Sequence, residues 1–154
     1  MPALTPTEKI DPRSPRFGAA VTSVLLVAIL VSYQAGPLAA LVLLLIQTAA
    51  FAAGSLLGLQ AQPWGVIYRR FVRPRLGAPA ELEDAAPPRF AQGVGLAFAL
   101  AALLGWFVSP VLFYIAIGFA LVAALLNAIF DFCLGCEMYL LGKRLRGRTV
   151  GAEG

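Results

Sequence analysis

Two long stretches without a charged residue limit what this chain can fold into. The first runs from Phe17 to Tyr68, and the second runs from Phe90 to Phe130. A helix needs about 20 apolar residues to cross a bilayer, so each stretch is long enough for two crossings and a tight turn. A soluble domain of which 60% is hydrophobic in such blocks would expose too much apolar surface. We therefore predict an all-α membrane protein with four transmembrane helices.

Prolines divide each stretch into two predicted spans, because Pro ends one helix and can open the next. The turns are expected at Gly36-Pro37 and Ser109-Pro110. The four predicted spans are about Ala19–Gln34, Leu38–Leu59, Ala91–Val108, and Val111–Phe130 and beyond. The segment that precedes Phe17 is charged and rich in proline, unlike a secretory signal. The first span is therefore expected to stay in the membrane.

All the basic residues fall on one side of these spans. Of the 12 Lys and Arg residues, 3 precede the first span, 5 lie between the second and third, 4 follow the fourth, and the two short turns have none. The positive-inside rule then places both termini and the middle segment in the cytoplasm. We predict a multi-pass protein of the cytoplasmic (inner) membrane with the lipid bilayer as its partner. This topology explains the pI near 9.5 without nucleic acid as a partner.

The two halves of the chain match at one constant offset in residue number, which we call the repeat offset. The matches pair Glu8 with Glu81, Asp11 with Asp84, Pro15-Arg16-Phe17 with Pro88-Arg89-Phe90, Pro37 with Pro110, and Arg70, Arg73 and Arg75 with Lys143, Arg146 and Arg148. Such a fixed period indicates an internal repeat. We predict a single membrane domain over 1–154, made of two tandem parallel helical-hairpin repeats at about 8–75 and 81–148.

Short interfacial helices are predicted between the repeats. Ile67–Val72 is expected to form a basic helix at the membrane surface, after a break at Trp64-Gly65 and ended by Arg73-Pro74-Arg75. Ala78–Pro88 is expected to be an extended loop. The aromatic residues expected to anchor the chain at the interfaces are Trp64, Tyr68, Trp106 and Tyr114.

The chain has two cysteines, Cys133 and Cys136. They align with Gln60 and Pro63 of the first repeat, so only the second repeat carries them. Residues three apart share a helix face, which brings both sulfurs to one side if the fourth helix continues. Gly135 would instead loosen or break the turn. Either geometry permits a disulfide, a dithiol or a shared soft metal.

The charges near this pair have opposing effects on a thiolate, which is the reactive form of cysteine. Acidic neighbours and the C-terminal end of a helix disfavour it, whereas Lys143 and Arg144 favour it if the chain folds back. An ionisable residue at the membrane edge is a functional candidate. The candidate catalytic residues are Cys133, Cys136, Asp131, Glu137 and Asn127.

Four interpretations of the cysteine pair stay open. In the first, the pair is a dithiol that exchanges with a thioredoxin-like partner. In the second it carries a persulfide, and in the third it is part of a metal site. In the fourth the cysteines are two small residues that pack a helix. A zinc site would need Asp131, Glu137 or a second subunit to complete four ligands. The chain has no His, which excludes His-based catalysis, and Glu137 stands where c-type haem attachment requires His.

Small residues at Gly54 and Gly58 form a packing face for use within the bundle or between two copies of the chain, so a homo-oligomer is an alternative assembly. Buried amides such as Gln47 are expected to join neighbouring helices. Whether the chain is an enzyme, and whether it uses a cofactor, is left open by these residues.

Several motifs resemble a known family. They are Ile10 to Phe17, Arg73 to Gly77, Glu81 to Asp84, Pro88 to Gln92, and Asn127 to Glu137. Together they resemble the bacterial membrane proteins with a "domain of unknown function 4395", over about Ile10 to Leu145. Genes of this family often lie near those of thioredoxin-like or rhodanese-like sulfurtransferase proteins. The resemblance implies thiol or sulfur chemistry at Cys133 and Cys136.

Our leading hypothesis is a membrane-embedded dithiol that exchanges electrons or sulfur with a cytoplasmic thioredoxin- or rhodanese-like protein. The alternative is a non-enzymatic helical scaffold, or a small transporter for a sulfur species or a soft metal.

Overall fold

The computed structural model describes residues 9–153, and helices make up most of this part of the chain. Within it, four helices of 21 to 23 residues are long and apolar enough to cross a membrane. They are α1 (Arg13–Ala35), α2 (Pro37–Ala52) with its π-helical continuation η2 (Ala53–Leu57), α5 (Ala86–Val108) and α6 (Pro110–Phe130). At about 1.5 Å per residue each matches the thickness of a bilayer core. The prediction of a four-helix, multi-pass membrane protein is confirmed.

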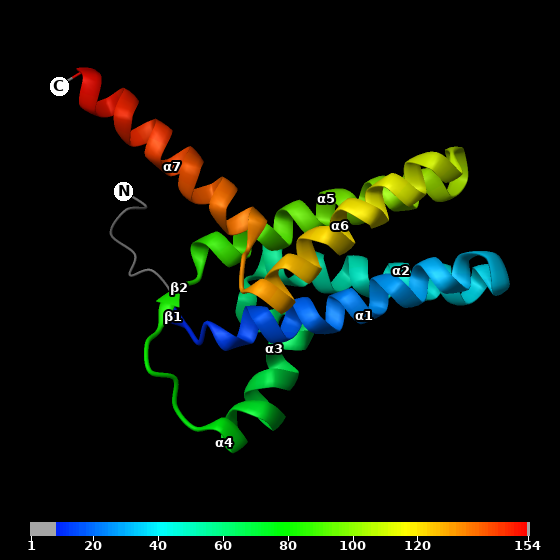
Figure 1. Cartoon of the computed structure of the whole chain (residues 1–154), viewed down its shortest axis with the longest axis horizontal. Helices are drawn as coiled ribbons and strands as arrows, with labels where there is room; N and C mark the ends of the chain where they lie inside the picture. The colour runs from blue at the N-terminus through cyan, green and yellow to red at the C-terminus, as the bar shows by residue number, and fades with distance from the viewer. Residues whose placement is uncertain (1–8, 154) are drawn as a thin grey trace.

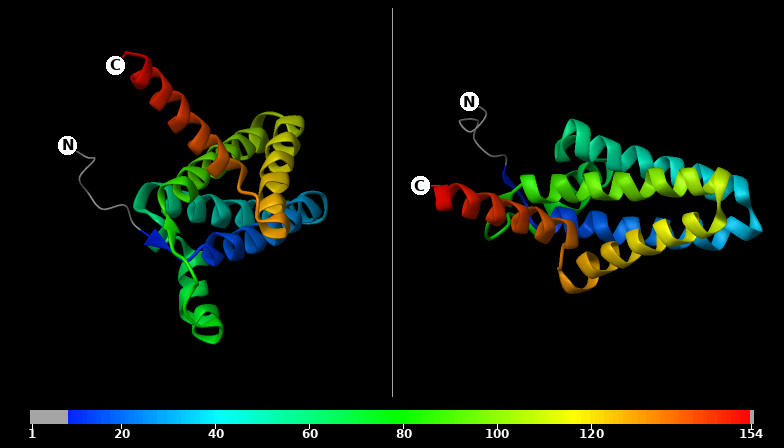
Figure 2. Two further views of the ribbon diagram at one scale, coloured as in Figure 1. Left: turned by 60° about the vertical axis from the view of Figure 1, so that its left-hand side comes forward. Right: turned by 90° about the horizontal axis from the view of Figure 1, so that it is seen from above.

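The four helices form a closed bundle in which α1 contacts α2 and α6, and α5 contacts α6 and α2. The tight turns of both hairpins lie at one end of the bundle (Figure 1). The chain between η2 and α5, the short strand β1 (Lys9–Ile10) before α1 and the start of the helix after α6 all lie at the other end (Figure 2). The charged residues of the described part belong to these segments or to the adjoining helix ends, so we call this the charged end.

The bounds of the helices follow the repeat offset seen in the sequence. Arg13 and Ala35 bound α1, and their equivalents at the repeat offset, Ala86 and Val108, bound α5. The spans Pro37–Leu57 and Pro110–Phe130 are related by the same offset at both ends. Within the predicted repeats, Glu8 and the side chain of Arg148 lie outside the described residues.

Two reciprocal contacts join the hairpins at the charged end. Arg16 donates from Nε and Nη2 to the carbonyl oxygens of Ala128 and Ile129, at 3.1 and 3.3 Å. Arg89 donates from the same two atoms to Ser55 and Leu56, at 2.9 and 3.1 Å. The donors and both pairs of acceptors are related by the repeat offset. Each arginine therefore satisfies terminal carbonyl groups of a spanning helix in the other hairpin.

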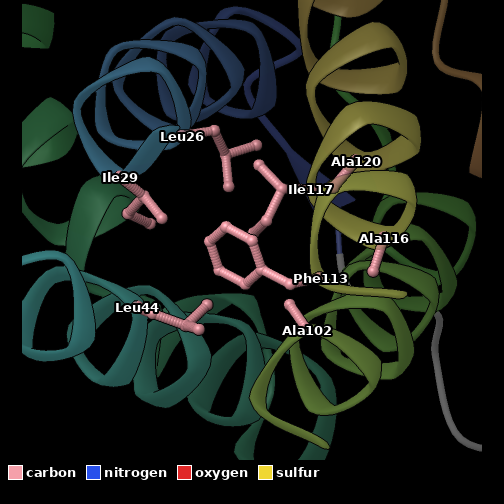
Figure 3. Close-up of a cluster of buried hydrophobic side chains, with 8 residues drawn as sticks. All are labelled: Leu26, Ile29, Leu44, Ala102, Phe113, Ala116, Ile117 and Ala120. Carbon is pink, nitrogen blue, oxygen red and sulfur yellow. The ribbon is translucent and has the colours of Figure 1, made fainter. Parts of the chain in front are cut away.

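The packed core occupies the middle of the bundle and the half near the turns. Its members come from all four spanning helices (Figure 3). They are Leu26, Ile29, Leu44, Ala102, Phe113, Ala116, Ile117 and Ala120. Tyr33 stacks on Phe113 with ring centroids 4.2 Å apart. A Cβ at Gly105 would overlap the backbone of Phe113, so this glycine permits the close approach of α5 and α6.

The segments outside the bundle differ from the predictions. A helical arm begins at Pro63 and runs through α3 (Pro63–Ile67), η4 (Tyr68–Val72) and α4 (Arg73–Leu76), after the short η3 (Leu59–Ala61). The predicted helix at Ile67–Val72 lies within this arm, which ends at Leu76, directly after the predicted end at Arg73-Pro74-Arg75. The predicted break at Trp64-Gly65 is wrong, because Gln62 caps the helix start by accepting the Gly65 N–H at 2.7 Å.

The predicted loop Ala78–Pro88 contains a short strand. β2 (Glu83–Asp84) pairs antiparallel with β1 (Lys9–Ile10), and α5 then begins at Ala86. The Asp84 carboxylate accepts the N–H of Ala86, the first residue of that helix, at 3.0 Å. A last helix, α7 (Leu134–Glu153), leaves the charged end and extends away from the bundle (Figures 1 and 2).

Candidate functional site

The cysteine pair lies at the start of α7. Helix α6 ends at Phe130, and Asp131 takes a left-handed conformation with φ of 55°. Phe132 N–H then donates back to the Leu126 carbonyl at 3.1 Å, which closes the end of α6. The expectation that the fourth helix continues past Phe130 is wrong, and so is the placement of the cysteines at the C-terminal end of a helix.

Cys133 caps the new helix. Its carbonyl oxygen accepts the Glu137 N–H at 3.0 Å, and its Sγ accepts the Cys136 N–H at 3.2 Å. The two cysteines form a disulfide, with Cα atoms 5.1 Å apart. Both side chains are partly exposed. A helix N-terminus favours negative charge, so this setting stabilises a thiolate where the expected C-terminal setting would oppose it.

Gly135 fixes the start of α7 against the bundle. A Cβ at this position would lie 2.7 Å from both Cα and Cβ of Ala91 in α5. The glycine therefore lies inside the helix and permits close packing of α7 on α5, rather than breaking the turn. The break lies at Asp131 instead, and its equivalent in the first repeat, Gly58, also has a positive φ, of 109°.

A cavity of about 250 Å³ opens at the charged end of the bundle and has Cys133 in its wall. Residues from the first halves of α1 and α5 and the last half of α6 line it. Thr22 and Phe98 lie about three helical turns from the starts of α1 and α5, so the cavity reaches about 15 Å into the bundle. Its inner end meets the packed core at Ala120.

Small residues leave this space open on one side of the bundle. On α2, Phe51 packs over Gly95, where a Cβ would lie 2.5 Å from the ring. The position equivalent to Phe51 on α6 is Ala124, which lines the cavity. Phe51 also lines the cavity, which lies between the two halves, and the alanine on α6 leaves room where a phenylalanine would fill it.

The cavity wall combines apolar and polar groups. The polar or charged side chains in it are Lys9, Asp11, Ser14, Thr22, Gln60, Gln62, Arg69, Arg73, Gln92, Asn127 and Cys133. Among the side chains that the structure describes, the Oε1 of Gln92 is a buried atom without a hydrogen-bond partner. This atom is enclosed by the bundle beside Gly54 and has almost no surface exposed in the cavity.

The residues predicted for the site are only partly brought together. Asn127 and Cys133 line the cavity. Asp131 and Glu137 are exposed at the end of α6 and in the first turn of α7, and neither lines the cavity. Within the described residues, no three His, Cys, Asp or Glu side chains gather as a metal site would require.

The sequence interpretation missed Gln62, Arg69 and Arg73 as cavity residues. Comparison of the repeats could have suggested the cavity itself, since Phe51 aligns with Ala124 and Gly54 with Asn127. Gly54 lies in a tightly packed position inside the bundle, because a Cβ there would lie within 2.9 Å of Gln62 and Gln92 side-chain atoms.

Asp11 joins three segments at the entrance of the cavity. Its carboxylate accepts Arg13 Nη2 at 2.8 Å and the Tyr68 hydroxyl at 2.9 Å, and Arg13 also donates to the Gly77 carbonyl at 2.9 Å. The Arg13 side chain is the main reason that the pKa of Asp11 lies below its usual value. Burial, with the bond to Asp11, raises the pKa of Tyr68. Tyr68 is 1% exposed, so its predicted role as an interface anchor is wrong.

The fold and the site define a class: a four-helix membrane protein with a disulfide-paired Cys-Leu-Gly-Cys at a helix N-terminus, beside a cavity open at one end. A family defined by a domain of unknown function (DUF4395) matches residues 10–144. The chain belongs to this family, as its motifs predicted. No curated protein matches the chain. No solved structure matches it either.

Proposed function

We propose that the protein is a membrane-embedded carrier of a dithiol–disulfide couple, which exchanges electrons or sulfur with a thioredoxin- or rhodanese-like protein. One observation carries the proposal: the disulfide lies at the N-terminus of α7, with Cys133 as the cap and in the wall of the cavity. Structural pairs in a packed helix would not need a cavity or partial exposure.

Exchange with a dithiol partner transfers two electrons and two protons from the partner to the chain. A partner thiolate attacks Cys133 Sγ, a mixed disulfide forms, and Cys136 leaves as a thiolate that takes up a proton. The second partner thiol then attacks the partner's own sulfur in the mixed disulfide and releases Cys133. The partner's two thiols become a disulfide, and the chain's disulfide becomes two thiols. For sulfur transfer, the reduced Cys133 thiolate would instead attack the terminal sulfur of a partner persulfide. Cys133 then becomes the persulfide, and the partner leaves as a thiolate that takes up a proton.

The surroundings of the pair suit a protein partner. Phe132, Leu134 and Met138 flank the cysteines and expose large apolar side chains. They offer contact area outside the spanning helices, on the charged end. A partner domain could reach Cys133 there without entering the bilayer.

We further propose that the charged end faces the cytoplasm, with both termini there, in the cytoplasmic membrane. The basic residues of the described chain gather at this end, and the two turns at the other end have none. The positive-inside rule supports that orientation. It puts the cysteine pair within reach of cytoplasmic thiol proteins.

The alternative of a transporter has less support. A conduit would need a path from the charged end to the turns, but Leu26, Phe113 and Ile117 fill the bundle beyond the cavity. A cavity closed at its inner end suits binding or reaction more than passage. The alternative of a helical scaffold makes the opposite prediction for the cysteines, which would then neither react nor exchange.

The test uses purified full-length protein in detergent. It is equilibrated with mixtures of reduced and oxidised thioredoxin, trapped with an alkylating agent and analysed by mass spectrometry. We expect a reversible change from the disulfide to the doubly alkylated form, and a trapped mixed disulfide through Cys133 in Cys136→Ser. Cysteines that stay paired or unreactive across all mixtures in folded protein would refute the proposal.

A further inference from the structure

We infer that the cavity beside Cys133 binds a low-molecular-weight thiol that carries an anionic group. The inference rests on the proposed function, because it names the substrate class of the same disulfide. It goes further, because a protein partner would meet the pair from outside, whereas this ligand would reach it from within the cavity.

The entrance of the cavity is positively charged. Lys9, Arg69 and Arg73 line it, and the carboxylate of Asp11 is already engaged by Arg13 and Tyr68. Arginine binds planar anions such as carboxylates with paired, charge-assisted hydrogen bonds. Among the described residues none of these three cations forms an ion pair, so their charge favours an anionic ligand over a neutral or cationic one.

The interior of the cavity suits a small ligand. The volume of about 250 Å³ is below the usual range for drug-sized ligands. The apolar wall at Ala123 and Ala124 accommodates the remaining carbon atoms.

The two cysteines differ in their access to the cavity. Cys133 lines the cavity, whereas Cys136 is not among the described residues that do. A bound thiolate would attack Cys133 Sγ, break the disulfide and release Cys136 as a thiolate that takes a proton from water. A second ligand thiolate would attack the ligand sulfur of the mixed disulfide, giving a ligand disulfide and Cys133 thiolate. Two ligand thiols are oxidised for each protein disulfide reduced.

The experiment compares two matched probes on the full-length protein in detergent. N-acetylcysteine carries a carboxylate, and its amide derivative is neutral with the same N–H donor. The rate at which each reduces the Cys133–Cys136 disulfide is measured against concentration by alkylation and mass spectrometry. We expect the rate to saturate with the acid and to rise linearly with the amide.

Two variants test the site. Arg73→Gln should raise the half-saturating concentration of the acid by about tenfold, as for the loss of one charge-assisted contact. Ala124→Phe, which copies the equivalent Phe51, should fill the cavity and abolish saturation. The matched controls are Arg75→Gln and Ala49→Phe, at exposed positions outside the cavity, and they should behave as the wild type.

Reduction by thioredoxin is measured on every variant in parallel. If thioredoxin reduces the disulfide but the acid shows no saturation, or Arg73→Gln and Ala124→Phe behave as the wild type, the inference is overturned and the proposed function stands. If neither thioredoxin nor the small thiols reduce it, the proposed function fails as well. Should Ala124→Phe fail to fold, Arg73→Gln still decides the outcome.

Discussion

At the residue scale, the two cysteines are chemically unequal. Cys133 is the cap of α7 and receives the Cys136 N–H, whereas Cys136 lies within the first turn. In reduced protein at neutral pH, we expect iodoacetamide to modify Cys133 about tenfold faster than Cys136, because the helix N-terminus stabilises its thiolate. Timed quenching and mass spectrometry of each peptide would measure this, and equal rates would contradict it.

Asp11 holds Arg13 and Tyr68 together at the entrance of the cavity. Asp11→Asn should lower the free energy of unfolding at pH 7 by about 1–3 kcal/mol, because Arg13 and Tyr68 lose a buried charged partner. The matched control Asp84→Asn should cost less, since an amide oxygen can still accept the Ala86 N–H.

The pH dependence of this effect has a defined sign. The folded pKa of Asp11 is lowered from 3.8, chiefly by the Arg13 side chain. Its stabilising contribution is therefore complete above that value and is lost as the pH falls through the lower folded pKa. Thermal unfolding in detergent from pH 7 downward should show wild type and Asp11→Asn converging only below about pH 4. A constant difference across this range would argue against the ion pair as the cause.

At the element scale, most of the helices could be predicted from the sequence and their junctions could not. Pro37 and Pro110 mark the turns because they begin α2 and α6. The end of α6 depends on a left-handed Asp131, a conformation that few non-glycine residues adopt and that sequence patterns do not reveal. The equivalent Gly58 was the available signal.

The packing of α7 on α5 can be tested through one glycine. Gly135→Ala should lower the melting temperature and change the rate of disulfide exchange, because the new Cβ must push Ala91 away by part of an ångström or more. Overpacking of this kind costs about 1–3 kcal/mol. Gly142→Ala on the same helix meets open space and should be neutral or slightly stabilising. Similar behaviour of the two variants would refute the close contact.

The reciprocal arginines should contribute equally to the joint between the hairpins. Arg16→Gln and Arg89→Gln should each destabilise the fold by about 1 kcal/mol, since both are exposed but bind unpaired helix-end carbonyls. They share no partner, so the double variant should show the sum of both effects. Thermal melts in detergent would measure this, with the exposed Arg144→Gln as control. A loss confined to one arginine would contradict the pairing.

At the scale of the whole molecule, the four spanning helices were predicted from the sequence, whereas the cavity was not. Charge-free stretches and turn prolines follow from the cost of polar groups in lipid, which acts on each segment separately. The cavity depends instead on which side chains face each other across helices, as with Ala124 on α6 and the space left by small residues on α1 and α5. The alignment of Phe51 with Ala124 was a signal in the sequence, but the cavity can be located only once the helices are paired.

The orientation of the chain in the membrane determines which compartment the cysteine pair faces. The described Lys and Arg residues lie at the charged end, and the turns at 36–37 and 109–110 carry no charge. Since translocating basic segments is disfavoured, the turns should face outward and the cysteines inward. In a chain with both native cysteines replaced by serine, Gly36→Cys should react with a membrane-impermeant maleimide in intact cells. Gly142→Cys should react only after lysis. The reverse pattern would place the disulfide outside, and its exchange partner would then have to be an exported protein.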